Sequence, residues 1–315
     1  MSESSVVLDR ARMIIQRVVE EVSKAVVGKR NVVDLMVAAI AAGGHVLLEG
    51  VPGVAKTLLS RAVASAFNVE FSRVQCTPDL LPSDIIGTFV YRDGRFEFVR
   101  GPIFADIVLV DEINRASPKT QSALLEAMQE RQVTVWGKTF RLPDTFTVIA
   151  TMNPVESEGV YPLSEAQVDR FLAKIPVGYP SREELVEIME RVRVIEEEWP
   201  VRPVASRDDL LFLRKAVWNV YVDYNVKLYI ASIVEETRRS PHVLLGGSPR
   251  AAIAMMQLSR ALALIEGRDH VTPEHVKRAA RPALLHRIVL RPEARLAGVT
   301  VDDIIDSVLE RVEPP

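Results

Sequence analysis

Residues 49–59 read Glu49-Gly50-Val51-Pro52-Gly53-Val54-Ala55-Lys56-Thr57-Leu58-Leu59. An apolar, β-rich run at 46–48 comes before this stretch, and a helical pattern at 57–66 follows it. Backbone N–H groups that curl at the beginning of a helix bind phosphate oxygens, so this context predicts a phosphate-binding loop. Lys56 would pair with β- and γ-phosphate oxygens of a nucleotide, and the Thr57 hydroxyl would bind Mg²⁺.

The loop departs from the general pattern GxxxxGK[ST] at one position, because Ala55 stands where the pattern has its second glycine. A methyl group is tolerated there only if the backbone avoids a positive φ, and we therefore expect a negative φ at Ala55. The alternative interpretation is an ordinary strand-to-helix turn that carries one lysine. We predict that the nucleotide-binding residues of the loop are Gly50, Val51, Pro52, Gly53, Val54, Ala55, Lys56, Thr57 and Leu58.

Two carboxylates follow a second buried run, at 107–110. Parallel sheets place their ligands at the carboxyl ends of strands, which is where Asp111 and Glu112 stand. Asp111 suits Mg²⁺, held directly or through a water, and Glu112 suits the general base that orients an attacking water. A strand that simply ends in two solvated acids is the alternative, but this is uncommon downstream of a phosphate loop. The combination favours ATP hydrolysis.

A further β-rich run at 147–150 leads to Asn153. A neutral amide beside Glu112 can hold the water without raising the pKa of the base by like-charge repulsion. Taken alone, Asn153 reads as a turn residue before Pro154. We predict a catalytic role for it only in combination with Glu112.

The order of patterns predicts an α/β domain at 1–179 and a helical domain at 180–315. Short β-rich runs with little alternation indicate a parallel sheet that is covered on both faces; these runs are 45–48, 71–75, 107–110, 147–150 and 174–177. Two apolar helices, 8–25 and 32–42, come first, and Asn31 is a candidate cap for the second. Alternation around Asp93-Gly94 and around Gly137 predicts β-hairpins at 88–99 and 133–142.

Capping signals predict the helices of the second half. Ser181 with Glu184, Ser206 with Asp209, and Thr272-Pro273 each mark the beginning of a helix. Ser248 reads as an N-cap, which places Arg250 in the first turn, where a cation opposes the helix dipole and a bound phosphate would relieve the conflict. We expect loops at 202–204 and 243–247.

Composition excludes several other classes of protein. The 315 residues carry 39 Lys+Arg against 42 Asp+Glu, a net charge of −3, and 48% are hydrophobic, which fits a folded protein and argues against a surface built for nucleic acid. One cysteine, Cys76, excludes an internal disulfide and a CxxC zinc site; we expect it in the core.

No secretory signal is seen at 1–12, and the apolar run 35–48 is too short to span a bilayer. We expect a cytoplasmic protein without membrane insertion.

With these motifs in place, nearly the whole chain resembles the MoxR family of the AAA+ ATPases. The most specific part is 101–130, which reads GPIFADIVLVDEINRASPKTQSALLEAMQE. The loop variant with Ala55 is also common in that family. The resemblance implies an α/β P-loop core with an all-α C-terminal lid. It assigns Lys56 and Thr57 to Walker A, Asp111 and Glu112 to Walker B, and Asn153 to sensor 1.

The resemblance also points to residues that spacing alone does not reveal. The segment 161–171 is similar to the family segment that bears the arginine finger, which makes Arg170 the candidate; an ordinary salt bridge of Arg170 is the alternative. Arg250 corresponds to sensor 2, acting on its own nucleotide or on that of a neighbour. Val27 and Gly28 resemble the adenine-contacting segment, with Lys29 where many relatives have Gln. Arg115 is either an interface sensor or a salt-bridge partner.

The family implies a function for the whole chain. It implies ATP hydrolysis with Mg²⁺ at the subunit interfaces of a homo-oligomeric, hexameric ring. Its work is chaperone-like, namely the remodelling or maturation of client proteins, including cofactor insertion, often with a von Willebrand factor A domain partner. The two hairpins would face the pore. The client cannot be named from the sequence.

Two other functions compete with this one. A nucleic-acid-associated ring motor of the same clade would use Arg92, Arg95 and Lys138 at the hairpin tips to follow a phosphate backbone. The acidic pI of about 6.0 and the absence of a separate DNA-binding domain argue against it. A nucleotide switch that does not hydrolyse is disfavoured by Glu112.

Overall fold

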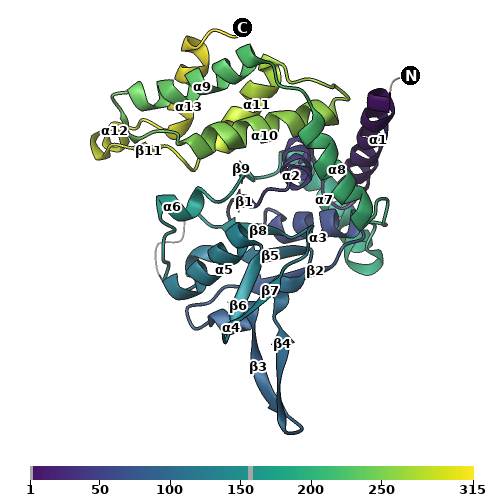
Figure 1. Cartoon of the computed structure of the whole chain (residues 1–315). Helices are drawn as coiled ribbons and strands as arrows, with labels where there is room; N and C mark the ends of the chain where they lie inside the picture. Colours follow the sequence, from purple (N-terminus) through teal and green to yellow (C-terminus); the bar gives the residue numbers. More distant parts are fainter. Residues whose placement is uncertain (1–2, 155–158) are drawn as a thin grey trace.

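The computed structural model describes residues 3–154 and 159–315. Its centre is a sheet of five parallel strands in the order β2-β5-β8-β1-β9 (Figure 1). These strands are β1 (Val46–Glu49), β2 (Phe71–Gln75), β5 (Ile107–Asp111), β8 (Thr147–Met152) and β9 (Ala173–Pro176). All five β-rich runs therefore form strands of one parallel sheet, which confirms the predicted α/β core. The central strands β5 and β8 are buried on both faces, and most of their residues are apolar.

Helices cover the sheet and connect its strands. In chain order they are α1 (Glu3–Ser23), α2 (Arg30–Ala41), α3 (Lys56–Ala66), α4 (Pro82–Ile86), α5 (Pro118–Glu130) and α6 (Glu165–Val168), with 3₁₀ turns at Pro102–Phe104 and Ile113–Arg115. The first helix begins and ends earlier than the predicted 8–25. The second begins at Arg30, and Lys29 stands at its N-cap without a side-chain hydrogen bond. Asn31 is thus inside the helix, and the prediction that it is the cap was wrong.

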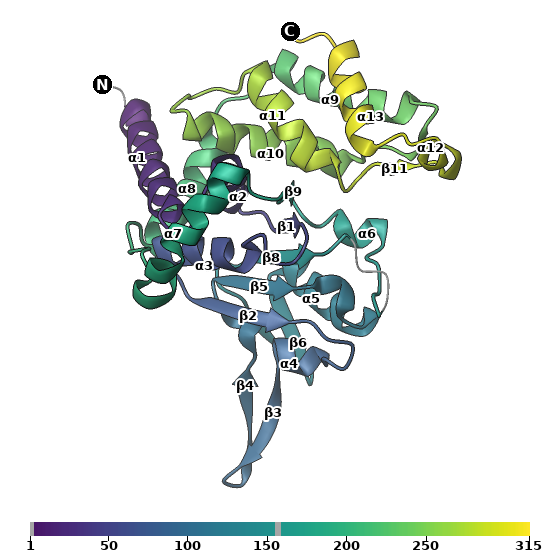
Figure 2. The same ribbon diagram turned by 180° about the vertical axis from the view of Figure 1, so that it is seen from behind.

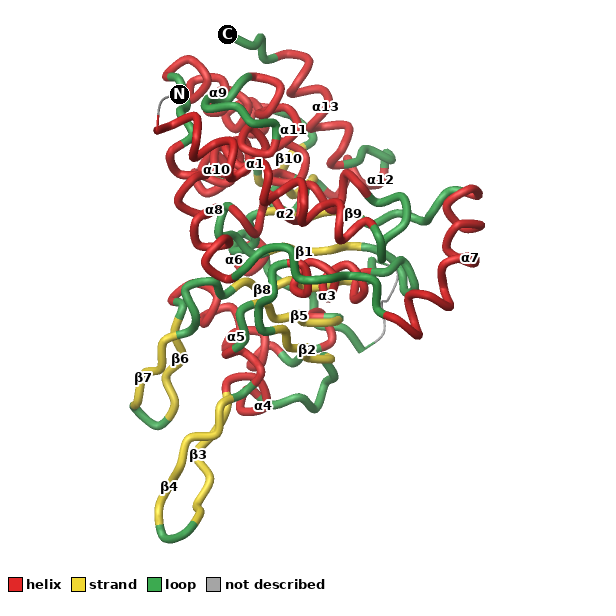
Figure 3. The backbone as a smooth tube through the Cα atoms, turned by 90° about the vertical axis from the view of Figure 1, so that its right-hand side faces the viewer, coloured by secondary structure: helices red, strands yellow, loops and turns green. Residues whose placement is uncertain are grey.

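Both predicted hairpins are present and project away from the sheet on the same side of the molecule (Figures 1 and 3). One consists of β3 (Gly87–Arg92) and β4 (Arg95–Arg100), and the other of β6 (Gln132–Val135) and β7 (Lys138–Arg141). Each turn uses positive φ values, at Asp93-Gly94 and at Trp136-Gly137, as tight two-residue hairpin turns require.

The C-terminal half is helical, as predicted, and most of its helices lie beyond the edge strand β9 of the sheet (Figure 2). Its helices are α7 (Arg182–Glu198), α8 (Arg207–Asn219), α9 (Tyr224–Arg239), α10 (Pro249–Ile265), α11 (Pro273–Leu284), α12 (Pro292–Leu296) and α13 (Val301–Arg311). The predicted beginnings of α7, α8, α10 and α11 are confirmed. The domain boundary at 179/180 stays a prediction.

One segment of this half differs from its prediction. Val243–Leu245 was expected as a loop, but it forms a short strand, β10, that pairs with β11 (Val289–Leu290). Two strands of three and two residues bury one side chain each, so neither has the length from which alternation can be recognised. Within residues 3–154 and 159–315, no helix has the length and apolar character needed to cross a bilayer.

Candidate functional site

The phosphate loop connects β1 to α3 and is shaped by close backbone packing. At Gly50 a Cβ would lie 2.5 Å from the carbonyl oxygen of Val177, so only glycine fits. Gly53 has a φ of +84°. Ala55 has a φ of +68° and forms the N-cap of α3. The expectation of a negative φ at Ala55 was therefore wrong. Ala55 adopts the left-handed conformation, which is strained for a residue with a Cβ.

Lys56 and Thr57 open α3 inside this loop. The ammonium group of Lys56 donates hydrogen bonds to the carbonyl oxygens of Gly50 and Val51, the latter at 3.1 Å. The hydroxyl of Thr57 donates to Asp111 Oδ2 at 3.3 Å. The first residues of the helix thus direct a cation and a hydroxyl into the space that the loop encloses.

The predicted acids and the predicted amide lie in the same place. A cavity of about 350 Å³, which we call the phosphate-loop cavity, is lined by residues 52–58 together with Arg73, Gln75, Asp111, Glu112, Thr151 and Asn153. Strands β1, β5 and β8 are neighbours in the sheet, so their carboxyl ends bring these side chains together. The structure therefore gathers Lys56, Thr57, Asp111, Glu112 and Asn153 into one site.

The carboxylates of this site are held by specific contacts. Asp111, which is buried, accepts hydrogen bonds from Arg73 Nε at 2.7 Å and from Thr151 Oγ1 at 3.1 Å. Glu112 has a φ of +57°, its N–H donates to Thr151 Oγ1, and its carboxylate pairs with Arg115 at 3.0 Å. The salt-bridge alternative for Arg115 is therefore what the structure shows.

The residues present fit a magnesium ion that is bound together with a nucleotide. Thr57 and Asp111 supply the hydroxyl and carboxylate oxygens that Mg²⁺ prefers, 3.3 Å apart. In the part of the chain that the structure describes, no three His, Cys, Asp or Glu side chains are grouped so that they could hold a metal by themselves. A magnesium ion here would need phosphate or water oxygens to complete its shell.

An apolar slot of about 100 Å³ adjoins the loop, lined by residues 25–27, Lys29, residues 53–55, Leu58, Pro180 and Ile188. Of the two residues predicted to contact the base, Val27 lies in the lining and Gly28 does not. Gly28 has a φ of +70°, and a Cβ there would overlap the carboxylate of Glu184. Lys29 donates a hydrogen bond to the carbonyl oxygen of Tyr179 at 3.1 Å. The slot is mostly apolar, which suits the binding of a base.

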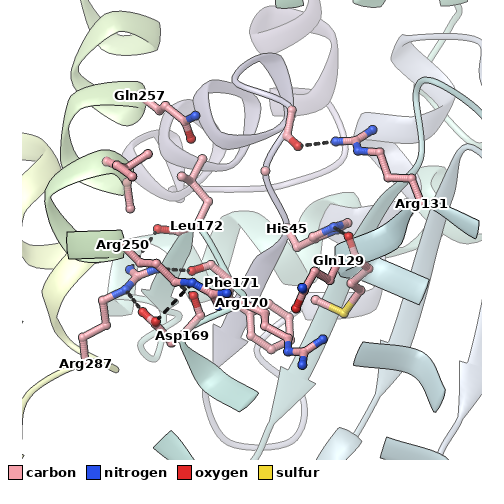
Figure 4. A pocket seen from close by; sticks show the side chains of 15 residues that line it. His45, Gln129, Arg131, Asp169, Arg170, Phe171, Leu172, Arg250, Gln257 and Arg287 are labelled. Carbon is pink, nitrogen blue, oxygen red and sulfur yellow. Dashed lines mark hydrogen bonds and ion pairs between the residues drawn. The ribbon is translucent and has the colours of Figure 1, made fainter. Parts of the chain in front are cut away.

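The two predicted arginines lie elsewhere. A second cavity, of about 270 Å³, contains Arg170 and Arg250 together with Arg131, Arg287 and Asp169 (Figure 4). We call it the arginine cavity. Arg170 donates a hydrogen bond to the carbonyl oxygen of Leu125 at 2.6 Å, and its Nε is buried without a hydrogen-bond partner among the described residues. Arg250 pairs with Asp169 at 3.8 Å.

The two cavities lie at opposite ends of the same strand. Residues 43–45, just before β1, line the arginine cavity, and residues 52–58, after β1, line the phosphate-loop cavity. The four residues of β1 span roughly 13 Å. Arg170 and Arg250 are therefore not brought together with Lys56 and Glu112 within one chain.

Comparisons with known proteins agree with this architecture. Residues 45–173 match the family model described as "ATPase family associated with various cellular activities (AAA)", and residues 235–308 match "AAA lid domain". The Mycobacterium tuberculosis protein "Chaperone MoxR1" is 45% identical over 96% of this chain and 82% of its own length. "Protein MoxR" of Methylorubrum extorquens is 32% identical over 94% and 93%. The chain belongs to the MoxR family of AAA ATPases.

Two further relatives of this MoxR-family chain cover its full fold. The Bacillus subtilis protein YeaC is 47% identical over 96% of this chain and 95% of its own length. A crystal structure of a Cytophaga hutchinsonii protein superimposes with a TM-score of 0.92 at 41% identity, covering 99% of this chain and 97% of that protein. The α/β core of the MoxR-family chain is thus followed by a helical lid, to which residues 235–308 belong.

Sequence reasoning missed several residues of the site in this MoxR-family protein. Arg73 and Gln75 come from β2, and Gln75 donates a hydrogen bond to Glu112 at 3.1 Å. The only signal was that polar residues alternate at the end of this run, which is equally typical of an exposed edge. Cys76, in contrast, is buried as expected, and burial together with the nearby Asp111 and Glu112 raises the pKa of its thiol to about 12.

Proposed function

We propose that this MoxR-family chain hydrolyses ATP with Mg²⁺ at the subunit interfaces of a homo-oligomeric, hexameric ring. The ring works in the cytoplasm. It uses the hydrolysis to remodel client proteins or to assist their maturation. Membership of an AAA ATPase family implies ATP binding and hydrolysis. The 45% identical relative is named a chaperone, which supports work on other proteins. A von Willebrand factor A domain protein is the partner class that we propose.

The phosphate-loop cavity supplies the roles that hydrolysis needs. Lys56 and the loop N–H groups hold the phosphates, and Thr57 and Asp111 hold the magnesium ion, which neutralises charge on the phosphate oxygens when it is bound. Glu112 accepts the proton of the attacking water, and Asn153 orients that water. Val27 and the apolar slot beside the loop hold the base.

The separation of the two cavities is the observation that supports the proposed assembly into a ring. An arginine that stabilises charge on the transferred phosphate must come close to it, and Arg170 and Arg250 lie at the other end of β1 from the loop. A second copy, turned so that its arginine cavity meets this phosphate-loop cavity, completes both sites. Contacts of this head-to-tail kind form a ring when the rotation between neighbouring copies closes, and a closed ring is what we propose here.

The hairpins suit a polypeptide client. Tyr91, Phe96 and Trp136 are exposed at their tips, where aromatic side chains provide large contact area with few rotatable bonds. Arg95 pairs with Glu97 at 2.6 Å, so one of the cations that a nucleic-acid motor would use is already neutralised. We therefore favour a protein client over nucleic acid.

Single substitutions test the proposal. We expect Glu112→Gln to lower the kcat for ATP by about 10²- to 10⁴-fold while nucleotide binding persists, because only the base is lost. Arg170→Ala should lower kcat by about 10³-fold or more. Arg311→Ala, at an exposed arginine of α13, is the matched control and should keep full activity. Normal hydrolysis by Glu112→Gln would contradict the proposal, and electron microscopy of that variant with ATP would count the subunits.

A further inference from the structure

Two consecutive side chains of the lid reach back to the core. Arg287 follows α11 and hydrogen-bonds Asp169 Oδ1 at 2.6 Å, the Asp169 carbonyl oxygen at 3.1 Å and the Phe171 carbonyl oxygen at 2.7 Å. His286 contacts the same Phe171 carbonyl oxygen through Nε2 at 3.0 Å. The residues on both sides of Arg170 are therefore held by the lid.

The hydrogen-bond donors of Arg287 are all matched by acceptors around it. An arginine has five N–H donors, and Arg287 directs Nε to Asp169, Nη1 to Leu172 and Ala283, and Nη2 to Asp169 and Phe171. Its side chain is only 4% exposed. Burial lowers the pKa of Arg287, and the hydrogen bond to Asp169 opposes that shift. A buried cation persists only when its donors are matched in this way.

The same contacts reach the second predicted catalytic arginine. Asp169 accepts from Arg287 through Oδ1 and faces Arg250 through Oδ2, at 3.8 Å, and Figure 4 shows Arg250 and Arg287 converging on this carboxylate. Ser248, the N-cap of α10, lies 3.5 Å from the same Oδ2 atom. Asp169 is thus the point where the core segment, α10 and the end of α11 meet.

We propose that Arg287 is a positioning residue that latches the lid onto residues 169–172, so that Arg170 and Arg250 are presented together to the nucleotide of the neighbouring subunit. The latch rests on the proposed function. It can affect hydrolysis only if the arginine cavity meets the phosphate loop of a second copy. A change in the contact between Arg287 and residues 169–172 then changes hydrolysis in the neighbour, while the chain's own phosphate loop, at the other end of β1, is left as it was.

The conservative variant Arg287→Lys is the first test. A lysine keeps the charge but cannot direct five donors to the same acceptors. We expect kcat for ATP to fall by about 10- to 100-fold, as small misplacements of a catalytic group do, with the KM for ATP and the Kd for a fluorescent ADP analogue unchanged. The matched control is Arg281→Lys, because Arg281 forms its ion pairs with Asp302 and Asp306, inside the lid.

Mixed rings separate positioning from folding. The variant Glu112→Gln has an inactive base but an intact arginine cavity, so it can serve a neighbour whose own phosphate loop is intact. Mixing Arg287→Lys with Glu112→Gln should therefore restore hydrolysis well above that of either variant alone. Mixing Arg170→Ala with Glu112→Gln is the reference.

The outcomes distinguish the two levels of the proposal. Restoration in both mixtures supports the latch. Restoration with Arg170→Ala but not with Arg287→Lys overturns the latch and leaves the proposed function standing. Restoration in neither mixture, with mixed assembly shown by native mass spectrometry, contradicts action across subunits and removes the basis of both. A rise in KM or in the Kd for ADP in Arg287→Lys would show damage to its own site and would also overturn the latch.

Discussion

At the scale of single residues, Ala55 is the strained point of the phosphate loop. A non-glycine residue in the left-handed region costs roughly 1–2 kcal/mol, and Ala55 lies there with a φ of +68°. We expect Ala55→Gly to raise the free energy of unfolding by up to about 1 kcal/mol, since the added freedom of glycine in the unfolded chain offsets part of the relief. Urea unfolding measures this change.

The control is the same substitution in ordinary helix geometry. Ala62 is buried within α3, so Ala62→Gly should lower the free energy of unfolding by about 1 kcal/mol or more. A loss of stability in both variants would mean that Ala55 is not strained.

His45 gives the fold a defined dependence on pH. It is buried, accepts from the Val148 N–H through Nδ1 at 2.9 Å, and lies 3.1 Å from the Met128 carbonyl oxygen through Nε2. Burial lowers its pKa to about 3. The folded state therefore keeps His45 neutral at a pH where the unfolded chain takes up a proton, so its contribution to stability is complete above about pH 6.5 and is lost as the pH falls toward 3.

The expected size of this effect can be measured by urea unfolding at two pH values. Between pH 7.5 and 5.5, His45 alone should reduce the free energy of unfolding by about 1.4 kcal/mol. The variant His45→Gln should lose about 1.4 kcal/mol less unfolding free energy over this pH range than the unchanged chain. His286, whose pKa is also lowered by burial, still contributes its own loss in both proteins. His242→Gln, at an exposed histidine, is the control. An unchanged pH dependence in His45→Gln would contradict the assignment.

At the scale of elements, the two hairpins form one unit. The rings of Phe98 in β4 and Phe140 in β7 stack with centroids 4.0 Å apart, and Phe89 stacks on Trp136 at 5.3 Å. Such pairs contribute about 0.5–1.5 kcal/mol beyond their burial. The hairpins are therefore joined by aromatic contacts as well as by the sheet from which they project.

Removing one ring should loosen the other hairpin. We expect Phe140→Ala to accelerate amide hydrogen exchange at residues 87–100 by about two- to tenfold, although the substitution lies in the other hairpin. Thr139→Ala is the matched control, because the Thr139 hydroxyl hydrogen-bonds Thr134 of its own hairpin, at 3.1 Å. Equal exchange at 87–100 in both variants would show that the stack does not couple them.

Local patterns predicted most elements. Asp93-Gly94 located a hairpin because its turn requires positive φ at adjacent residues, and Ser206 with Asp209 located a helix because its capping contacts lie within one turn. The strand β10 was missed because it is defined by pairing with residues more than 40 positions away. What depends on neighbours in the chain could be predicted, and what depends on distant partners could not.

The residues of the site show the same difference between local and distant contacts. Lys56, Thr57, Asp111 and Glu112 were found because each stands at a strand end or helix beginning that the sequence itself marks. Arg73 was missed, since its contact with Asp111 depends on β2 lying beside β5. The sequence also contained no measure of the strain at Ala55, because the conformation of the loop and not the residue type sets that φ.

At the scale of the whole molecule, the α/β core and the lid place two cavities at opposite ends of one strand. The phosphate-loop cavity contains Lys56 and the acids, and the arginine cavity contains Arg170 and Arg250. The resemblance had pointed to Arg170 and Arg250, but that they share one cavity, with Arg287 from the lid, follows only from the fold. Under the proposed function, a chain built in this way has no complete catalytic set until a second copy meets it.

Turnover per chain should therefore depend on protein concentration. We expect the ATPase rate per chain to be constant where rings are complete and to fall steeply on dilution, by about tenfold or more for each tenfold dilution below the assembly constant, because the active form contains more than one chain. Mass photometry at the same concentrations should show the loss of rings following the loss of activity. Arg170→Ala should assemble over the same range and stay inactive throughout, since it removes the cation and not the contact. Constant turnover per chain in samples that contain monomers alone would mean that one chain carries a complete site, and neither the ring nor the latch at Arg287 could then be maintained.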